Sequence, residues 1–475
     1  MIEAMKYSSI LFIFTMAAQA AHAQSVISST PVSASNPTSE QGPSSEGQSA
    51  SSVSSRWTRY VMLRGDAAEA RLDRKLSAPA IASQSALVDL NLTGKTEFSD
   101  FFRFQADVDL RARRSWNYTR RNILSGQIQT TQDIGQDNPE YRLALNELYA
   151  NGDLKDGAQY TAGKKRILWG TGFAANPTDL LNPAKNPLDP TYERRGAWLI
   201  QAESIQEQSA VAVFMAPGVV EDKHTLPKEV GIYKDENGKR SAHYLLGWRY
   251  YMLLGGADIN LMLFTSEKYQ DEMSRALKIG WSWSQIATAI SKQLETHAEF
   301  LVQRGSVRPT SSGISRLESK DLFVKALVGF RYDLENESAV LVEYLHQADG
   351  DSVADLQTRL QNLRALAIKY PSMAEKSSLP VLMRNMLFLN YQRFKFNDDT
   401  FLSWSVAHNL HDNSGYQGPV LQWNPRESTM ITLSASSDYN LEKNSGAVVT
   451  GLGRVRSNEL NPAKARMGLE VKSYF

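Results

Sequence analysis

The final eleven residues of the chain, 465–475, alternate between apolar and polar side chains almost to the last position. One side of the expected strand carries apolar side chains (Met467, Leu469, Val471 and Phe475), and the other carries charged ones (Arg466, Glu470 and Lys472). Because strand side chains alternate with period two, such a segment can face lipid and water at once. We therefore predict a transmembrane β-barrel, closed by a terminal strand that contains Leu469, Val471 and Phe475.

The amino-terminus predicts export from the cytoplasm. Lys6 precedes the apolar run 10–18, and residues 21–23 form a small-x-small pattern. This arrangement is typical of a signal peptide, here residues 1–23, that is cleaved after Ala23.

The next segment, residues 24–56, is dominated by Ser, with Gln, Pro, Gly and Glu, and such a composition cannot build a core. We predict that it forms a disordered periplasmic tail and that residues 57–475 form the barrel. The predicted location is the cell outer membrane.

The composition narrows the chemistry. The chain has no cysteine, which excludes thiol catalysis and cysteine-ligated metals. Lys plus Arg number 52 against 51 for Asp plus Glu, so no excess of positive charge points to nucleic acid. The most apolar stretch, 245–264, contains Arg249, Asp258 and a Gly-Gly pair. Charged residues at the centre of a membrane helix each cost roughly 2.5–3.5 kcal/mol, so we predict two strands and a tight turn here.

Alternation and turn residues predict about 18 strands. The clearest are 102–113, 277–283 and 322–332, where apolar residues occupy every second position. The others are expected at 57–65, 86–95, 143–152, 156–166, 194–203, 206–216, 242–253, 256–266, 294–304, 337–347, 384–395, 398–409, 417–424, 428–439 and 465–475. The predicted fold is all-β, a closed antiparallel transmembrane barrel with long external loops.

The connections support this interpretation. Those after even-numbered strands are short, whereas several after odd-numbered strands are long, at 114–142, 167–193, 217–241, 305–318, 348–383 and 440–464. Short periplasmic turns that alternate with long external loops are typical of outer-membrane barrels. A water-soluble β-sandwich has no reason to keep this parity.

One segment resembles a known family. It reads Gly-Lys-Lys-Arg-Ile-Leu-Trp-Gly-Thr-Gly over 163–172, continues with Asn-Pro pairs to 187 and Asp-Pro at 189–190, and ends in Glu-Arg-Arg-Gly at 193–196. This pattern is similar to the strand-and-loop signature of the alginate-export-like and porin-like outer-membrane barrels of Gram-negative bacteria. The resemblance implies a channel for polar or anionic solutes, including an exported polysaccharide, and it does not fix the substrate.

The same segment has a physical interpretation of its own. Four prolines stiffen the loop, and Asn-Pro and Asp-Pro pairs start turns. A rigid loop can fold into the lumen and narrow it, or it can pack on the rim and bridge lipopolysaccharide phosphates. Basic residues are expected at its two roots (Lys164, Lys165, Arg166, Arg194 and Arg195).

Inward positions of the predicted strands carry charges that could select solutes. The expected pore-lining residues are Arg103, Asp107, Asp109, Arg111, Arg113, Glu299, Lys325, Arg331 and Glu343, with Glu470 and Lys472 on the terminal strand. Rings of Arg and Lys favour anions. Inward charges can equally pair across neighbouring strands and stiffen the wall. The basic run 111–121 fits either anion attraction or contact with lipopolysaccharide.

Three other patterns leave alternatives open. His408, Asp412 and Ser414 are the residue types of a hydrolase, or simply parts of a polar external loop. Asp349 and its acidic neighbours suggest a hard-cation site without EF-hand spacing. Leucines near helical spacing in 354–369 suggest an amphipathic helix that covers the mouth, plugs the pore or meets a partner.

These observations predict a channel that passes small polar or anionic solutes across the outer membrane. The alternatives are an exporter of a secreted polysaccharide and a barrel without transport function, either a surface hydrolase or an adhesin. We expect no enzymatic activity, cofactor, bound metal or nucleic acid. The expected partners are outer-membrane lipids, lipopolysaccharide, the solute, and the barrel-assembly machinery through the terminal strand.

Overall fold

The computed structural model describes residues 54–474 with gaps at 71–79, 121–132, 155–156, 168, 182–195, 218–231, 235–239, 243, 267–275, 311–312, 335–336, 351–383, 441–447, 451–452 and 456–462. The regular secondary structure of these residues consists of β-strands. The described part of the chain contains no helix that is long and apolar enough to cross a membrane. The predicted signal peptide, the tail to residue 53, and the predicted helix in 354–369 lie outside the described residues.

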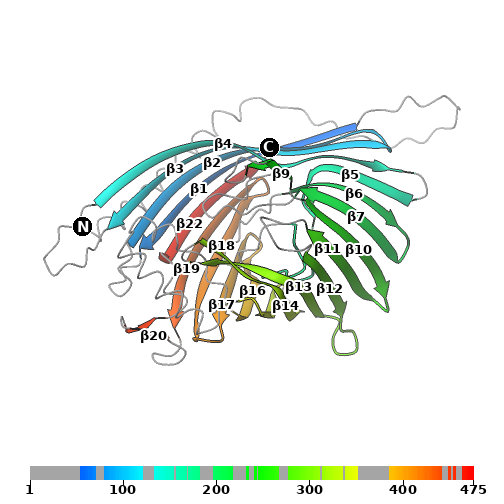
Figure 1. Ribbon diagram of the computed structural model, residues 1–475. Coiled ribbons are helices and arrows are strands. Elements are labelled where there is room, and N and C mark those ends of the chain that lie inside the picture. Colours follow the sequence, from blue (N-terminus) through cyan, green and yellow to red (C-terminus); the bar gives the residue numbers. More distant parts are fainter. Residues whose placement is uncertain are drawn as a thin grey trace.

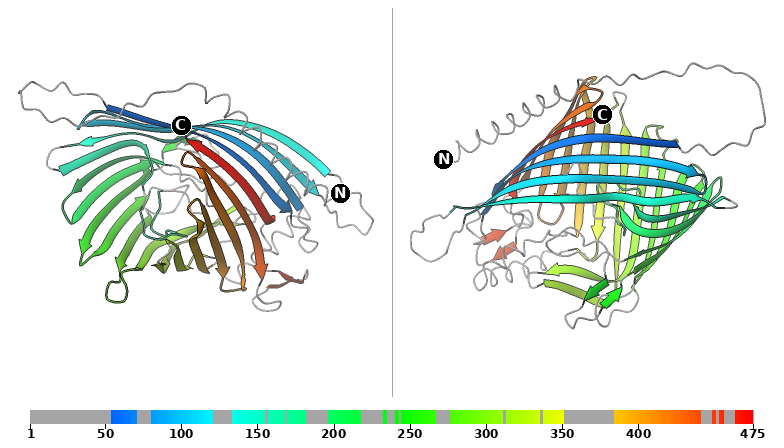
Figure 2. Two further views of the ribbon diagram at one scale, coloured as in Figure 1. Left: turned by 180° about the vertical axis from the view of Figure 1, so that it is seen from behind. Right: turned by 90° about the horizontal axis from the view of Figure 1, so that it is seen from above.

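Eighteen strands form one antiparallel sheet that closes on itself. Each strand pairs with the next along the chain, and β22 pairs with β19 on one edge and with β1 on the other. Figure 1 shows β22 between β1 and β19, and Figure 2 shows the same wall from behind and from above. Closure satisfies the backbone groups of every strand without exposing a sheet edge to lipid.

The barrel strands are β1 (Ser54–Ala70), β2 (Ala80–Ser99), β3 (Phe102–Arg120), β4 (Asp133–Asp153), β5 (Ala158–Lys165), β6 (Ala197–Ile205), β7 (Ser209–Pro217), β10 (Tyr244–Leu254), β11 (Ala257–Ser266), β12 (Ala276–Ile286), β13 (Leu294–Thr310), β14 (Gly313–Asp333), β15 (Ala339–Gln347), β16 (Asn385–Asn397), β17 (Thr400–Asn409), β18 (Ser414–Arg426), β19 (Thr429–Asn440) and β22 (Ala463–Tyr474). Two separate hairpins, β8 (Ile232–Lys234) with β9 (Arg240–Ala242) and β20 (Val448–Thr450) with β21 (Gly453–Val455), lie within predicted external loops. The predicted all-β closed barrel is confirmed, and each predicted strand overlaps one barrel strand.

Several strands are longer than predicted at the ends away from the short turns, including β1, which continues to Ala70, and β2, which begins at Ala80. Strand β3 continues to Arg120 and β4 begins at Asp133, so most of the predicted loop 114–142 is a paired hairpin. Strands β13 and β14 likewise occupy most of the predicted loop 305–318. About 9–11 residues suffice to cross the membrane, so these strands extend beyond it. Backbone pairing needs no apolar face there, and the alternation that marks the membrane segment is therefore absent.

The two faces of the barrel differ as the alternation predicts. Exposed apolar side chains such as Leu110, Leu322 and Val328 cover the outside, which suits contact with lipid. Most of the buried polar side chains, such as Asp109 and Glu299, come from the alternate positions and face inward. In β22, Leu469 pairs with Leu433 and Gly65, which places the predicted closing strand at the seam.

The tight turn predicted within 245–264 is also confirmed. Gly255 and Gly256 have φ angles of 60° and 80°, and they join β10 to β11. Glycine adopts this left-handed backbone conformation at little cost, whereas a β-carbon opposes it. Phe475, the remaining predicted residue of the closing strand, lies outside the described residues.

Candidate functional site

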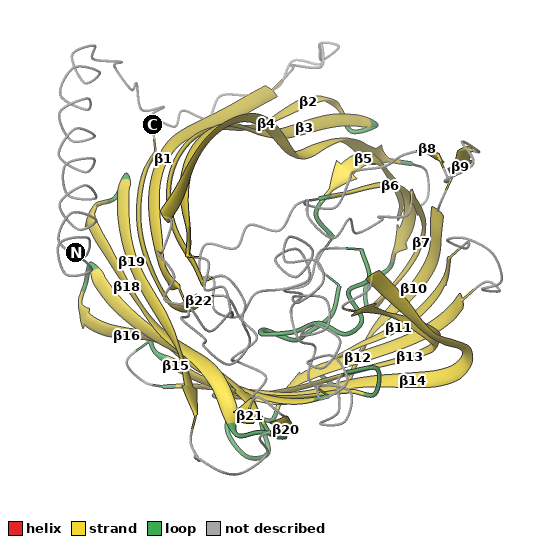
Figure 3. Ribbon diagram, turned by 60° about the vertical axis from the view of Figure 1, so that its left-hand side comes forward, coloured by secondary structure: helices red, strands yellow, loops and turns green. Residues whose placement is uncertain are grey.

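The connection between β5 and β6 turns into the barrel. Its described part, residues 166–181 without 168, lies inside the ring of strands in Figure 3. Gly170 in this loop has a φ of 91°, and a β-carbon there would lie 2.6 Å from the Glu299 Oε1 atom. Both the backbone conformation and the close contact therefore require glycine. We name residues 166–181 the inner loop.

An apolar cluster attaches one end of the inner loop to the wall. Ile167, Trp169 and Leu181 pack with buried side chains of β6, β7 and β11. The Trp169 ring centroid lies 4.8 Å from that of Phe214 and 5.9 Å from that of Phe264. Burial of these aromatic side chains fixes the point where the loop leaves β5, because aromatic rings contribute large apolar areas.

Glu299 on β13 holds the middle of the inner loop. Its Oε1 atom accepts hydrogen bonds from the backbone amides of Thr171 at 2.6 Å and Gly172 at 2.7 Å. Its Oε2 atom accepts from the Thr178 amide at 3.1 Å and the Thr178 hydroxyl at 2.8 Å. Hydrogen bonds to an ionised carboxylate are short and strong, so four of them compensate for its burial.

Glu343 on β15 holds the following residues in the same way. Its Oε1 atom accepts from the Phe173 amide at 2.6 Å, and its Oε2 atom accepts from the Ala174 amide at 2.7 Å. His297 Nε2 lies 2.8 Å from the same Oε1 atom. Ala174 then packs against an apolar cluster from β14 to β17, which includes Leu327.

The predicted pore-lining role of Glu299 and Glu343 is corrected by this geometry. Both side chains face inward, as the alternation predicts, but both are fully buried beneath the inner loop. A carboxylate without solvent contact does not line a water path. Its role is to bind the loop backbone.

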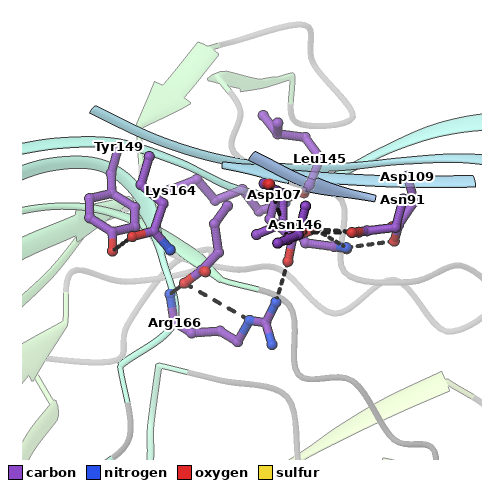
Figure 4. A network of polar contacts seen from close by, with 12 residues as sticks. Asn91, Asp107, Asp109, Leu145, Asn146, Tyr149, Lys164 and Arg166 are labelled. Carbon is purple, nitrogen blue, oxygen red and sulfur yellow. Dashed lines mark hydrogen bonds and ion pairs between the residues drawn. The ribbon is translucent and has the colours of Figure 1, made fainter. Parts of the chain in front are cut away.

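The wall formed by β2, β3 and β4 carries a second set of buried acids. Asn91 Nδ2 donates to Asp107 Oδ1 at 2.7 Å and to Asp109 Oδ1 at 2.5 Å. Asn146 Nδ2 donates to Asp109 Oδ2 at 2.5 Å and to Asp107 Oδ1 at 3.3 Å. Asn146 lies where the register between β3 and β4 shifts, and this bulge turns its amide toward both carboxylates. Figure 4 shows the network.

Arginines neutralise these acids from the lumen side. Arg111 binds Asp89 through Nε at 2.6 Å and Asp109 through one terminal nitrogen at 2.5 Å. Arg166, the first residue of the inner loop, binds Asp107 at 2.6 Å, and its backbone amide donates to Glu147 at 2.7 Å. The inner loop is therefore fixed at its root to the wall opposite Glu299 and Glu343.

A further basic pair lies on β12 and β14. Lys325 Nζ is 3.1 Å from Asp349 Oδ2, to which Gln303 Nε2 also donates at 3.5 Å. Lys278 acts electrostatically on both Lys325 and Asp349. Two lysines thus share one carboxylate. The other acids of the suggested cation site, Asp351 and Asp355, lie outside the described residues, so that suggestion stays a prediction.

Exposure of the ion pairs changes along the barrel. Away from the short turns the base is the more exposed partner: Arg111 is 20 % exposed against 0 % for Asp89 and Asp109, Arg166 is 32 % against 10 % for Asp107, and Lys325 is 23 % against 10 % for Asp349. Beside the short turns the acid is more exposed in four of five pairs: Asp153 is 38 % against 22 % for Arg103, and Asp333 is 54 % against 34 % for Arg331, whereas Lys95 at 49 % slightly exceeds Glu97 at 43 %. The deeper lumen therefore presents mainly positive groups to water.

The remaining predicted site residues have the following positions. Lys164 is fully buried and donates to the Leu145 carbonyl, and Lys165 lies over the Tyr149 ring at 5.1 Å. Lys472 lies over the Tyr60 ring at 3.8 Å, near the seam. The side chain of Arg113 and the whole of Arg194 and Arg195 lie outside the described residues, so their predicted roles are untested.

The residue types of a hydrolase do not assemble into a triad. Ser414 Oγ donates to Asp412 Oδ1 at 2.6 Å, which is a turn contact. His408 Nδ1 lies 3.0 Å from the Tyr439 hydroxyl, and His411 Nε2 lies 3.0 Å from Asn385 Nδ2. A nucleophilic serine needs a histidine base within hydrogen-bond reach, and this serine binds the aspartate instead.

Comparisons with known proteins agree with this architecture. No protein-family model matches the sequence, and no curated protein matches it at a significant level. The structure of OccK7 (OpdD) from Pseudomonas aeruginosa is similar, with a TM-score of 0.51 and 10% identity, over 89% of this chain and 98% of that one. OccK2 (OpdF) from the same organism has a TM-score of 0.47 and 11% identity, over 88% and 97%. Salmonella typhi OmpF with daunomycin has a TM-score of 0.41 and 9% identity, over 88% and 97%.

At these identities the likeness shows the fold alone. A closed antiparallel barrel with an apolar outer face and a polar inner face is a transmembrane β-barrel of the outer-membrane type.

Proposed function

We propose that the protein is a water-filled channel that passes small polar solutes across the outer membrane, with a preference for anions. A barrel of this strand number is wide enough to leave an aqueous path. The inner loop narrows that path by lying against β13 and β15. The solute itself is not specified by these features.

The exposure of the ion pairs carries the proposed anion preference. Arg111, Arg166 and Lys325 are each more exposed than the carboxylates that hold them. The buried acids fix the position of the bases, and the bases present the charge that a solute meets first. Basic residues that line a narrow path favour anions over cations.

The same proposal covers processing and partners. Residues 1–23 direct export, residues 24–53, which precede β1, form a periplasmic tail, and the barrel-assembly machinery recognises β22. Basic residues at the external rim contact lipopolysaccharide phosphates. The protein is not an enzyme and uses no cofactor.

A second candidate function is export of a polysaccharide, as the resemblance to alginate-export-like barrels implies. One observation favours it: the resembling segment 163–196 contains the inner loop, which contacts the lumen network through Arg166. An exporter would pass a linear acidic chain, so acidic oligosaccharides should interrupt its current at concentrations far below those of their monomers. If oligomers and monomers block the current with equal potency, the result contradicts polysaccharide export and supports the small-solute channel.

Planar-bilayer recording of the purified protein tests the proposed channel. We expect the conductance to rise in steps. In a KCl gradient, we expect a reversal potential whose sign indicates a preference for anions. Heat-modifiable gel mobility establishes that the recorded sample is a folded barrel. A folded barrel that gives no conductance steps overturns the proposal.

A matched pair of variants tests the charge argument. Arg166→Gln removes a base that is the exposed partner of its ion pair, whereas Arg331→Gln removes one of similar exposure whose acid is the exposed partner. We expect Arg166→Gln to reduce anion preference more than Arg331→Gln does. Equal effects of the two substitutions would contradict the assignment of selectivity to the deeper lumen.

A further inference from the structure

A second group of cations lies on the inner wall between β5 and β10. Arg249 is inward-facing on β10, with its Cζ atom 5.7 Å from the Trp169 ring centroid and 5.8 Å from that of Tyr251. Its Nε donates to Asn260 Oδ1 at 2.8 Å. Lys165 lies over Tyr149. We name Lys165, Gln201, Glu203, Arg249 and Asn260 the β5–β10 patch.

Neither cation of the patch is neutralised by a direct ion pair with a described residue. With the described residues, neither Lys165 nor Arg249 makes an ion pair of the kind that Arg111 makes. Glu203 acts electrostatically on both cations, and Glu147 also acts on Lys165. An aromatic face attracts a cation without cancelling its charge. The two bases are therefore able to bind an added anion.

The patch also contains a buried acceptor that lacks a donor. Gln201 Nε2 donates to Glu203 Oε2 at 3.2 Å, but Gln201 Oε1 is buried and has no hydrogen-bond partner among the described residues. The side chain as a whole is 8 % exposed. Buried polar atoms are nearly always paired in folded proteins, so an unpaired acceptor beside two cations indicates a place for a donor from outside the chain.

The patch adjoins the root of the inner loop, because Arg249 lies over the Trp169 ring and Glu147, which accepts from the Arg166 amide, also acts on Lys165. Gly247 on β10 pairs with Phe214, a contact of the inner loop, and Arg249 lies beyond it toward the Gly255–Gly256 turn. A solute at the patch is thus on the short-turn side of the inner loop. Lys325 and Gln303 bind Asp349, which follows the end of β15 that lies away from the short turns.

We infer that the β5–β10 patch is a second solute-binding station, for an organic anion that also carries hydroxyl groups. Arg249 and Lys165 bind the anionic group, while Gln201 Oε1 and the Glu203 carboxylate accept from the hydroxyls. The Tyr149, Trp169 and Tyr251 rings hold the two bases in place. This inference rests on the proposed channel function and adds the class of solute that pauses there.

Three probes test the recognition of the anionic group and the recognition of the hydroxyl groups separately. Gluconate carries charge and hydroxyls, propionate carries only charge, and sorbitol carries only hydroxyls. Their apparent affinities are read from concentration-dependent block of single-channel current in planar bilayers. We expect gluconate to bind more tightly than propionate or sorbitol. Because a hydrogen bond to a charged group is strong, Arg249→Gln should weaken gluconate binding about tenfold or more and should weaken propionate binding as well.

A pair of glutamine substitutions tests the proposed recognition of the solute hydroxyl groups. Gln201→Leu should weaken gluconate binding about threefold to tenfold and leave propionate binding unchanged. Gln422→Leu removes a part-buried glutamine on β18, whose Nε2 donates to Asn424 Oδ1 at 3.3 Å outside both networks, and it should change neither. The inference is overturned if gluconate binds no more tightly than propionate. It is also overturned if gluconate binding is unchanged in both Arg249→Gln and Gln201→Leu. In that case an anion-selective current would still support the channel, whereas a folded barrel without current would remove both proposals.

Discussion

Two inner walls of the barrel carry buried carboxylates and neutralise them in different ways. On β2 and β3, Arg111 binds Asp89 and Asp109, and asparagine amides also donate to Asp109. On β13 and β15, Glu299 and Glu343 are bound mainly by backbone amides of the inner loop. The first arrangement leaves a cationic side chain facing water, and the second leaves a loop facing water. Buried carboxylates on inward positions therefore produce a charged surface in one case and an anchored loop in the other.

The largest expected effect separates the loop from its wall. Glu299→Leu removes the acceptor for the Thr171, Gly172 and Thr178 amides, and each unpaired buried amide costs about 1–3 kcal/mol. We expect the inner loop to detach and the single-channel conductance to rise. Glu343→Gln, which keeps one carbonyl acceptor, should have a smaller effect. Unchanged conductance in Glu299→Leu would show that the carboxylate does not hold the loop.

The next effect tests the opposite wall. Arg111→Gln leaves Asp89 and Asp109 buried without their cation, which costs about 3–5 kcal/mol when a buried pair is broken. Arg331→Gln breaks an exposed pair that contributes only about 0–1 kcal/mol. We expect Arg111→Gln alone to lower the temperature at which the folded gel band disappears. A similar temperature for both variants would mean that the Arg111 network does not stabilise the wall.

A smaller effect tests how closely the loop approaches Glu299. Gly170→Ala places a methyl group 2.6 Å from Oε1 and forces a β-carbon onto a backbone with φ of 91°. A residue held in such a conformation costs about 1–3 kcal/mol. We expect a modest loss of thermal stability and a slight increase in conductance. Both effects should be smaller than those of Glu299→Leu, because Gly170→Ala strains one contact whereas Glu299→Leu removes several. A matched control, Gly255→Ala at the β10–β11 turn, meets no neighbouring atom and should leave conductance unchanged.

The barrel could be predicted from the sequence because its physical cause is local. Period-two alternation and turn residues located all the barrel strands, including the glycine turn at Gly255. The ends of β1, β2, β3, β4, β13 and β14 were missed, because the strands continue above the membrane where no apolar face is required.

The site was only partly predictable because its contacts join distant segments. Alternation placed Glu299 and Glu343 on the inner face but could not reveal the loop that covers them, which lies more than a hundred residues earlier in the chain. Asp89 and Asn91 lie on the inward face of the predicted strand 86–95 and could have been selected by that signal. Asn146 could not, because a register shift turns it inward.

A crosslinking measurement tests the contrast between the two walls most directly, because the chain has no native cysteine. Ala174 and Leu327 pack in one cluster, so Ala174→Cys with Leu327→Cys brings two thiols together only when the inner loop lies on the β13–β15 wall. Ala174→Cys with Thr93→Cys on β2 is the control pair for the opposite wall. We predict that a short bifunctional thiol reagent joins the first pair in the folded protein, leaves the control pair unjoined, and does not change the single-channel conductance. Failure of the first pair to join, or a fall in conductance when it does, would contradict a loop held permanently against that wall.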